Sequence, residues 1–326
     1  MDPVVSICCI TYNQVDYIED AIDSILSQKT SFPFEVLIHD DASSDGTLEK
    51  LQHYEDEDSR IRVFKESKNR YKDGISYINE ILIPSARGKY IAICEGDDYW
   101  ISNLKLQKSV EYLESHPHCS LYANAALLQD AAGEFIGEMG LGSEERDLST
   151  SDLVNNWHIP TASFVFKKTD GVDYAREWTF KTPVGDFPRA FYLSTVGYIH
   201  YCPECLSVYR YGSTGSWTVR NRSSLDAAIR SAQAWLEMLV NIDDATKGEY
   251  HSEIIDSAAS KVMRLYGRIG KAALDAPLAK ETWNKLKATK KLLALCLRLL
   301  GRLGFDLQRR NWSGLGRWAI VRIDRK

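Results

Sequence analysis

The order of strand-like and helix-like segments in the first hundred residues restricts the fold more than any other feature. Four short apolar runs with β-prone residues occur there: Val4–Thr11, Phe34–His39, Ile61–Phe64 and Tyr90–Cys94. The gaps between them contain apolar residues at helical spacing, such as Ile18, Ala21, Ile22 and Ile25 in the first gap. This alternation predicts an α/β fold that is Rossmann-like, with a mostly parallel sheet flanked by helices.

Acidic residues directly follow two of these predicted strands. Glu95-Gly96-Asp97-Asp98 ends the fourth strand, and Asp40-Asp41 ends the second. The carboxyl ends of parallel strands meet at one edge of a sheet, where ligands of open α/β sheets bind. Clustered carboxylates are hard oxygen ligands, which suit Mg²⁺ or Mn²⁺ together with a phosphate. The sequence therefore predicts a metal and phosphate site at this edge, and a polar turn with solvated acids is the alternative.

Residues 119–211 continue the same predicted domain. Further strands are predicted at Cys119–Asn124, Thr161–Phe166 and Leu206–Tyr211. Between the first two, the Gly- and acid-rich segment Asp130–Ser149 is predicted to be a mobile loop. Asp186 lies two residues before Pro188 at the expected start of a helix. On pattern alone an ordinary N-cap explains this aspartate better than a functional role.

Composition excludes several classes of protein. A chain of 326 residues with 44% hydrophobic and 26% charged residues is typical of a soluble globular protein. Its seven cysteines show neither a disulfide framework nor zinc-ligand spacing, which favours a reducing, cytoplasmic setting. Met1 leads almost at once into the first predicted strand, so no signal peptide is expected. The longest apolar run, Leu292–Leu300, contains Arg298 and is too short to cross a bilayer.

The composition changes near residue 221, which divides a predicted domain 1–220 from a basic, mainly helical region 221–326. Residues 261–326 contain 17 Lys and Arg against 4 Asp and Glu, whereas the whole chain has a formal net charge of −5. Leu and Trp residues among these basic residues suit a helix on the surface of an anionic membrane. A helix packed on the first domain with a solvated basic face explains the pattern equally well. Nucleic-acid binding is not expected, because no known binding motif is present.

Four segments, taken in order, resemble a family 2 glycosyltransferase of the GT-A fold. Val5–Asn13 is similar to the opening strand and turn of that family, and Val36–Thr47 to its nucleoside-binding stretch. Gly88–Trp100 resembles the strand that ends in a DxD-type metal motif, with Glu95 in place of the commoner first Asp. Gly185–Pro188 looks like the segment with the general base in bacterial polysaccharide-type members. The resemblance covers about the first 215 residues.

The resemblance implies a role for each matching residue. Asp97 would bind the metal, Mn²⁺ or Mg²⁺, and Asp186 would be the catalytic base. Asp40 would accept a hydrogen bond from the nucleotide base, typically uracil, and Arg210 would reach the diphosphate. The other residues implied to bind the nucleotide or the sugar are Thr11, Tyr12, Asn13, Asp41, Asn69, Glu95 and Asp98.

These roles imply an inverting transfer of a sugar from a nucleotide-sugar donor to a glycan or lipid-linked acceptor, as in surface-polysaccharide assembly at the cytoplasmic face of a membrane. A metal stabilises the diphosphate leaving group, and one carboxylate base with no protein nucleophile gives a single displacement. A sugar nucleotidyltransferase is the alternative enzyme, although the expected Gly-rich phosphate loop is replaced by Thr11-Tyr12-Asn13-Gln14. A non-catalytic nucleotide-sugar-binding protein is a third possibility.

Overall fold

The structure is a computed structural model that describes residues 2–70, 73–74, 76–155, 157–180, 182–213, 224–275, 277–285, 305–309 and 318–322. The chain divides into two compact units. The first unit contains residues 1–150, 158–179 and 185–219, and the second contains 151–157, 180–184 and 220–326. Two short segments of the predicted 1–220 domain therefore group with the second unit. The functional division at residue 220 stays a prediction.

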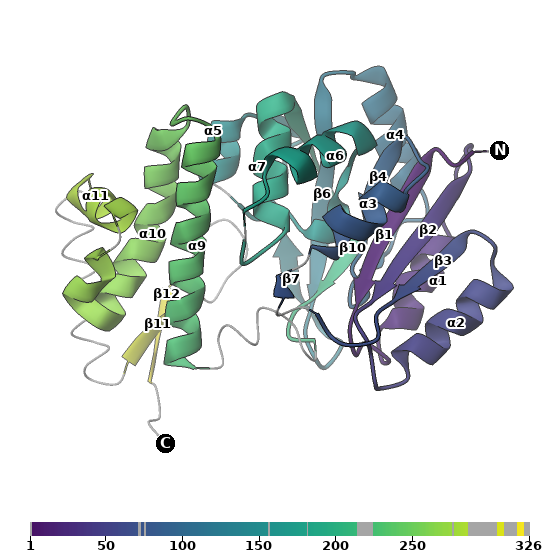
Figure 1. The fold of residues 1–326 in the computed structure, drawn as a ribbon, viewed down its shortest axis with the longest axis horizontal. Coiled ribbons are helices and arrows are strands. Elements are labelled where there is room, and N and C mark those ends of the chain that lie inside the picture. The colour runs from purple at the N-terminus through teal and green to yellow at the C-terminus, as the bar shows by residue number, and fades with distance from the viewer. Residues whose placement is uncertain are drawn as a thin grey trace. The chain divides into compact units, whose positions relative to one another are not determined.

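The first unit begins with four parallel strands, as the alternating pattern predicts (Figure 1). They are β1 (Val5–Thr11), β2 (Phe34–Asp40), β3 (Ile61–Lys65) and β4 (Tyr90–Ile93). Their order in the sheet is β3-β2-β1-β4, with α1 (Ile18–Leu26) and α2 (Thr47–Glu57) in the first two connections. β1, β2 and β4 are almost completely buried, which explains their continuous apolar runs.

The remaining strands make the sheet mixed rather than parallel throughout. β9 (Val165–Lys167) is antiparallel to β4 and to β6 (Cys119–Gln129), while β10 (Tyr198–Arg210) is parallel to β6. β5 (Tyr99–Trp100) pairs antiparallel with the end of β10. The predicted strand Thr161–Phe166 was placed too early, because residues 161–163 form the 3₁₀ helix η3 (Thr161–Ser163). β10 begins eight residues earlier than the predicted Leu206.

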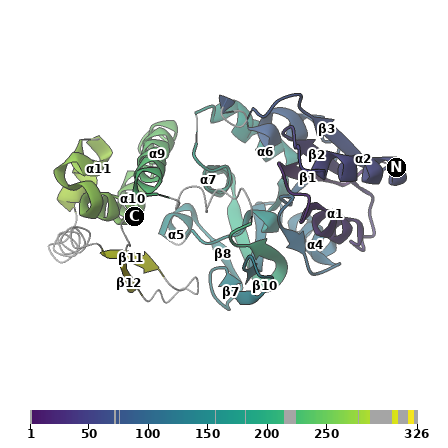
Figure 2. The same ribbon diagram turned by 90° about the horizontal axis from the view of Figure 1, so that it is seen from below.

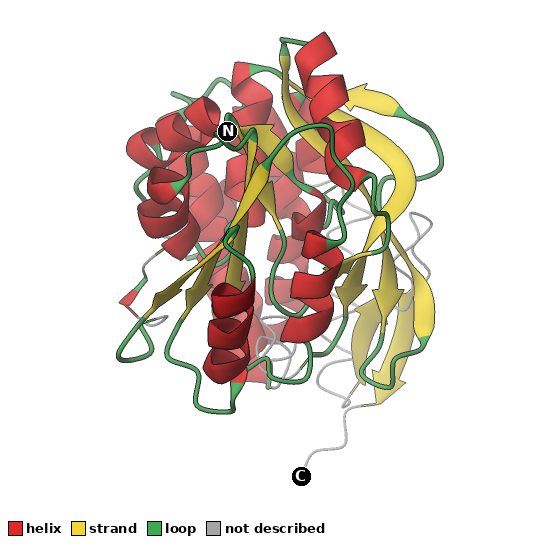
Figure 3. Ribbon diagram, turned by 90° about the vertical axis from the view of Figure 1, so that its right-hand side faces the viewer, coloured by secondary structure: helices red, strands yellow, loops and turns green. Residues whose placement is uncertain are grey.

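Helices cover both faces of this sheet. α4 (Lys105–Ser115), α6 (Lys168–Glu177) and α7 (Asp186–Val196) join α1 and α2 in the first unit. Figure 2 shows α1 and α4 on one face of the sheet and α6 on the other. The red helices lie on both sides of the twisted yellow strands in Figure 3. The predicted helix around residues 75–82 is seen as the π-helix η2 (Ile78–Leu82), which continues into α3 (Ile83–Ser85).

The prediction of a mobile loop over residues 130–149 is wrong. β7 (Phe135–Met139) pairs antiparallel with β6, and β8 (Arg146–Leu148) pairs antiparallel with β10. Both strands are short and mostly exposed, with Phe135 58% exposed and Ile136 50% exposed. A strand with both faces exposed has no alternation of apolar and polar residues, so the pattern that usually reveals a strand is missing here.

The second unit is mainly helical in the part that the structure describes. It contains α9 (Leu225–Ala245), α10 (His251–Ile269), η4 (Gly270–Leu274) and α11 (Pro277–Lys285), and most of α5 (Thr150–Asn155). Ser224 caps α9, since its hydroxyl accepts a hydrogen bond from the amide of Ala227 at 3.1 Å. Two short strands, β11 (Phe305–Arg309) and β12 (Trp318–Arg322), pair antiparallel.

The predicted membrane-binding helix lies largely outside the described residues. Its apolar run Leu292–Leu300, its basic neighbours and Trp312 all lie there. Within the described residues, no helix is both long enough and apolar enough to cross a membrane.

Lys105 is a buried cation in the core of the first unit. Its ammonium lies 4.6 Å from the centre of the Trp100 ring and donates a hydrogen bond to the carbonyl of Ser163 at 3.2 Å. Burial lowers the pKa of Lys105 to about 7, and the nearby Cys94 opposes this shift. The charged form is disfavoured because the surroundings of the ammonium replace little of its hydration.

We expect the Lys105→Met variant to have a different pH dependence of stability from the wild type. The unfolded chain binds the lysine proton up to pH ~10.4, whereas the folded chain releases it near pH 7. The unfolded state therefore binds more protons in this window, and the free energy of unfolding of the wild type, relative to the variant, should rise with pH from about 7 to about 10. Urea denaturation at several pH values measures this difference.

Lys108→Met is the matched control for this experiment. Lys108 is on the same helix, but it is 40% exposed and paired with Glu204. The stability difference between the wild type and this control should stay constant over the same pH range. A constant difference for Lys105→Met as well would contradict the pKa of Lys105 given above.

Candidate active site

The ends of β1, β2 and β4 bring the two acidic clusters to one edge of the sheet. Thr11 and Asp40 are register partners at the ends of β1 and β2. The amide of Asp41 donates to the carbonyl of Thr11 at 3.1 Å, and the amide of Gly96 donates to the carbonyl of Ile10 at 3.0 Å. Both clusters thus flank the end of β1, as the sequence predicts.

Gly96 lets the acidic turn lie directly against the loop after β1. A Cβ atom at this position would lie 2.4 Å from Oε1 of Gln14 and 3.0 Å from Cβ of Thr11. A larger residue would therefore push the turn away from β1. The turn itself is closed by a hydrogen bond from the amide of Asp98 to the carbonyl of Glu95 at 3.0 Å.

Asp97 and Asp98 are held by the end of β10 and the residues after it. Oδ2 of Asp97 accepts a hydrogen bond from the hydroxyl of Ser213 at 2.6 Å, and Oδ1 of Asp98 accepts one from the amide of Arg210 at 2.9 Å. Burial raises the pKa of Asp97, while Ser213, Arg210 and Gln14 lower it. Burial, with Asp97 and Glu95 nearby, raises the pKa of Asp98 well above its usual value. The ionised forms of Asp97 and Asp98 are therefore less favourable than the ionised form of an exposed aspartate.

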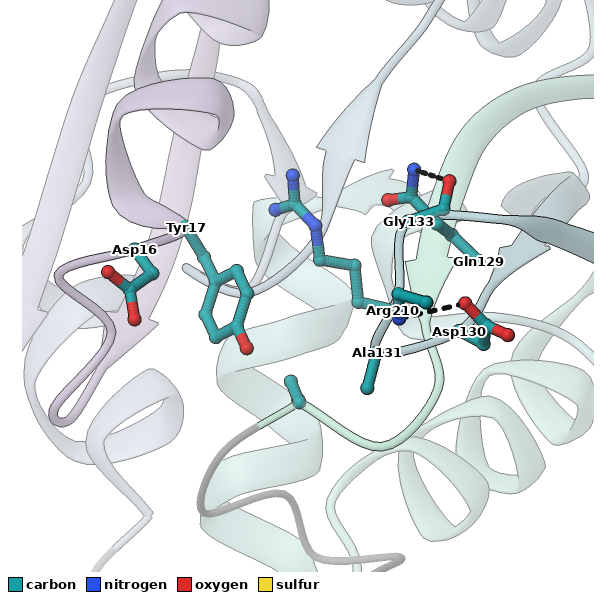
Figure 4. Close-up of a pocket in the computed structure, with 9 residues that line it drawn as sticks. Asp16, Tyr17, Gln129, Asp130, Ala131, Gly133 and Arg210 are labelled. Carbon is teal, nitrogen blue, oxygen red and sulfur yellow. Dashed lines mark hydrogen bonds between the residues drawn. The ribbon is translucent and has the colours of Figure 1, made fainter.

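Arg210 places its guanidinium among aromatic and acidic side chains. It forms an ion pair with Asp20 and lies over the rings of Tyr17 and Tyr99, 5.1 and 4.5 Å from their centres. It also donates to the carbonyl of Asp97 at 3.2 Å. Figure 4 shows this side chain in a hollow between Tyr17 and the turn that follows β6. The hollow is lined by Asp16, Tyr17, Gln129, Asp130, Ala131, Ala132, Gly133, Arg210 and Ser213. A contact with a diphosphate stays a prediction.

Asp40 and Asn13 organise the two loops that follow β1 and β2. The amide and the hydroxyl of Ser43 both donate to the carboxylate of Asp40, which is fully buried. The amide of Asn13 donates to the hydroxyl of Ser43 at 2.9 Å, and its Oδ1 accepts from the amide of Ser44 at 2.9 Å. Asn13 has a φ of 52°, a left-handed conformation that asparagine tolerates better than most residues. Both residues therefore shape the loops, and their contact with a nucleotide stays a prediction.

The other predicted nucleotide-binding residues lie around these loops. Oδ1 of Asp41 accepts hydrogen bonds from the hydroxyl of Tyr77 at 2.5 Å and from the amide of Arg70 at 2.8 Å. Nδ2 of Asn69 donates to the carbonyl of Asp41 at 3.4 Å. Thr11 is buried and Tyr12 is 42% exposed. The exposed ring of Tyr12 is free to face a planar ligand, whereas Asp41 mainly anchors the segment that follows β3.

Asp186 and Glu95 bring acidic groups from two different elements together. Asp186 is the first residue of α7, Gly185 is the N-cap, and the Asp186 carboxylate accepts a hydrogen bond from the amide of Phe187 at 2.8 Å. Burial, helped by the charges of Asp97 and Asp186, raises the pKa of Glu95 to about 8, and Arg189 opposes this shift. The charge of Asp186 thus contributes to the raised pKa of Glu95, and Gly185 rather than Asp186 occupies the N-cap position. The prediction that Asp186 is an ordinary N-cap is therefore wrong, because Asp186 is the first residue of the helix.

Three residues of the site were missed by the sequence interpretation: Gln14, Arg189 and Ser213. Ser213 donates a hydrogen bond to Asp97, Gln14 helps to lower the pKa of Asp97, and Arg189 is a buried arginine on the same helix as Asp186. Gln14 directly follows the Thr11-Tyr12-Asn13 motif, and Arg189 follows Asp186 by one helical turn. Those spacings are the only sequence signals for them, whereas Ser213 meets Asp97 across 116 residues of chain.

The donor set fits a hard divalent cation only in combination with a ligand. Among the described residues, no cluster of three or more His, Cys, Asp and Glu side chains could by itself hold a metal. Oδ2 of Asp98 is buried and has no hydrogen-bond partner among those residues. Mg²⁺ and Mn²⁺ typically use one or two carboxylates and complete their coordination with phosphate and water. Asp97 and Asp98 thus fit a metal that is shared with a bound diphosphate.

The sequence is similar to a glycosyltransferase family and to proteins named as glycosyltransferases. Residues 6–135 match the model of the family described as "Glycosyl transferase family 2". The uncharacterized protein Rv1520 of Mycobacterium tuberculosis is 34% identical over 217 residues, which are 65% of this chain and 60% of that protein. The chain therefore spans about 60% of the length of this relative. The enzyme WfgD of Escherichia coli, named UDP-Glc:alpha-D-GlcNAc-diphosphoundecaprenol beta-1,3-glucosyltransferase, is 31% identical over 170 residues, 52% of this chain and 62% of the enzyme.

Two solved structures with the same fold contain bound nucleotide sugars, and one of them is named a mannosyltransferase. The chain is similar to TarS of Staphylococcus aureus (residues 1–349, in complex with UDP-GlcNAc), with a TM-score of 0.53 and 15% identity, covering 98% of this chain and 99% of that one. It is also similar to the mannosyltransferase PcManGT of Pyrobaculum calidifontis in complex with GDP-Man and Mn²⁺. The TM-score is 0.51 and the identity 18%, covering 93% of this chain and 88% of that one. At these identities the likeness shows the fold, and it confirms the expected GT-A architecture.

Proposed function

Because the chain belongs to glycosyl transferase family 2, we propose that it transfers a sugar from a nucleoside-diphosphate donor to a glycan or lipid-linked acceptor in polysaccharide biosynthesis. The observation that carries this proposal is the convergence of acids at the end of β1. Glu95, Asp97 and Asp98 come from the turn after β4, and Asp186 comes from the first turn of α7. A metal-bound diphosphate and a general base need this arrangement.

Asp97 and Asp98 would hold a Mn²⁺ or Mg²⁺ ion, with the diphosphate oxygens as further ligands. The ion supplies Lewis-acid stabilisation of the charge that develops on the leaving diphosphate. Ser213 and the Arg210 amide orient the two carboxylates, and Gly96 keeps the turn close to the loop after β1. The raised pKa of both aspartates supports this role, because a cation compensates the charge that burial disfavours.

Asp186 would take the proton of the acceptor hydroxyl as its oxygen attacks the anomeric carbon. The new glycosidic bond forms while the bond to the diphosphate breaks, and the bonding electron pair leaves with the diphosphate. One base and no protein nucleophile imply a single displacement with inversion of the anomeric centre. Glu95, whose pKa burial raises to about 8 in the metal-free chain, is in the same turn as Asp97 and would contact the sugar of the donor.

A uridine nucleotide is the donor that we propose first. The name of WfgD specifies UDP-Glc, and the TarS structure contains UDP-GlcNAc, although PcManGT was solved with GDP-Man. The acceptor in the name of WfgD is a diphosphoundecaprenol-linked sugar, which supports a lipid-linked acceptor here. Such an acceptor would place the protein at the cytoplasmic face of a membrane, and the basic residues after residue 260 would suit an anionic surface.

A thermal-shift panel of UDP, GDP, dTDP and CDP, with and without Mn²⁺, tests the donor class. We expect one nucleotide to stabilise the protein in a metal-dependent way, because the diphosphate completes the coordination that Asp97 and Asp98 leave open. A ligand present at about 100 times its Kd adds ~2.7 kcal/mol to the free energy of unfolding. Mn²⁺ alone and each nucleotide with EDTA are the controls. Equal stability in all conditions would contradict the proposed donor site.

A further inference from the structure

Arg189 is a buried cation on α7 that no step of the proposed reaction uses. Only 1% of its surface is exposed, and it is the largest of the fully buried side chains in the described part of the chain. Its guanidinium lies 5.9 Å from the centre of the Phe166 ring and 5.6 Å from that of the Tyr174 ring. Nη2 donates to Oδ1 of Asn79 at 2.8 Å, whereas Nε has no hydrogen-bond partner among the described residues.

Packing alone does not explain an arginine at this position. Burial of a guanidinium costs several kcal/mol unless good ionic and hydrogen-bonding partners compensate the loss of water. Here the hydrogen-bonding partner is the neutral amide of Asn79, and the rings of Phe166 and Tyr174, near the outer limit of cation–π distance, attract the guanidinium only weakly. What an apolar side chain could not provide is a positive charge that acts on the carboxylate of Asp186, one helical turn away.

Arg189 lies one helical turn after Asp186, and residues three apart share one face of a helix. The charge of Arg189 therefore acts on the same face of α7 that directs Asp186 toward the site. Burial disfavours the charged guanidinium and lowers its pKa, and the negative charge of Asp186 opposes this shift. A cation on this face attracts the carboxylate of Asp186 and, through its hydrogen bond to Asn79, holds the first turn of α7 against η2.

Asn79, the hydrogen-bond partner of Arg189, belongs to a segment that is attached to the end of β2 through Asp41. Asn79 is in η2, the π-helix that begins directly after Tyr77. The hydroxyl of Tyr77 donates to Asp41 at the end of β2, and its ring stacks on His39 at 3.8 Å between ring centres. Hydrogen bonds and stacking thus connect Asp41 through Tyr77 and η2 to Arg189. π-helical turns of this kind occur frequently at functional sites.

We propose that Arg189 is a positioning residue that fixes the first turn of α7, and with it Asp186, against η2 and the acidic turn. This inference rests on the proposed transferase function and adds to it a residue that acts through the base. It implies that the position of the base depends on η2, which Tyr77 attaches to Asp41. Arg189 should therefore affect the chemical step more than donor binding.

The test compares Arg189→Met and Arg189→Lys with the wild type. The donor is a sugar nucleotide that contains the nucleotide selected by the thermal-shift panel. Release of the nucleoside diphosphate measures turnover. We expect kcat to fall by about 10- to 100-fold in Arg189→Met, since a base misplaced by about 1 Å can cost about 10² in rate. The KM for the donor should stay within about threefold of the wild type, because the donor contacts are unchanged. Arg189→Lys keeps the charge and should recover part of kcat.

Arg176→Met is the matched control, because Arg176 is on α6 and 71% exposed. It should leave kcat and KM unchanged. Asn79→Leu removes the hydrogen-bond acceptor and should lower kcat in the same direction by a smaller factor. The double variant Arg189→Met/Asn79→Leu should be no slower than Arg189→Met alone, because coupled residues are not additive.

A folded Arg189→Met variant with kcat within about twofold of the wild type would overturn the proposal, as would a rise in KM equal to the fall in kcat. If Arg189→Met does not fold, the effect of Asn79→Leu on kcat decides whether the positioning role holds.

If the wild type releases no nucleoside diphosphate, the transferase function fails. Amide hydrogen exchange then decides whether Arg189 has the positioning role. In Arg189→Met, residues 186–190 should exchange faster than in the wild type while β1 is unchanged. Equal exchange in α7 would overturn the role of Arg189.

Discussion

Replacement of Asp186 by asparagine should lower kcat by about 10²- to 10⁴-fold, the usual contribution of a general base. The amide keeps the size of the side chain but cannot take the proton of the acceptor hydroxyl. Asp186 is on α7 and is not one of the residues that would hold the metal, so the metal-dependent stabilisation by nucleotide should be the same as in the wild type. Turnover kinetics and the thermal-shift assay on the same sample measure both quantities.

Asp173→Asn is the matched control for Asp186→Asn, because Asp173 is an aspartate on α6 with a side chain 44% exposed that pairs with Arg176. It should leave kcat unchanged. If Asp186→Asn kept more than about a tenth of the wild-type kcat, the assignment of Asp186 as the base would be wrong. Retained nucleotide binding without turnover in the wild type itself would instead favour the non-catalytic nucleotide-sugar-binding alternative.

Replacement of Asp97 by alanine should remove both metal-dependent nucleotide binding and turnover. Asp97 is one of the two carboxylates that we propose for the metal, and no three-residue acidic or histidine cluster in the described part of the chain could replace it. The stabilisation of ~2.7 kcal/mol expected at about 100 times Kd should therefore be lost at the same ligand concentration. Thermal unfolding with and without Mn²⁺ and the selected nucleotide measures this loss.

The stability of metal-free Asp97→Ala separates loss of binding from loss of fold. Burial raises the pKa of Asp97 in the folded chain, so its ionised carboxylate destabilises the metal-free fold at neutral pH relative to the unfolded chain. Metal-free Asp97→Ala should therefore unfold at the same temperature as the wild type or a higher one. Asp16→Ala, at an exposed acid in the neighbouring hollow, is the control and should keep the metal-dependent shift. An unchanged shift in Asp97→Ala would show that Asp97 does not bind the metal.

The sequence predicted correctly those features that depend on short stretches of chain. The buried strands β1, β2 and β4 appear as continuous apolar runs, and the acids that follow β2 and β4 lie at the same edge because parallel strands end together. The family resemblance also came from local motifs, and the match over residues 6–135 supports it. β7 and β8 were missed because exposed strands have no apolar periodicity.

The contacts that complete the site could not be predicted, because they join residues far apart in the chain. Ser213 meets Asp97 across 116 residues, the Arg210 amide meets Asp98 across 112, and Arg189 meets Asn79 across 110. The sequence by itself determined the α/β order and placed the acids at strand ends, since both follow from the periodicity and chemistry of short segments. Only the tertiary structure decided which side chains orient those acids and how burial shifts their pKa values, because both depend on packing between distant segments.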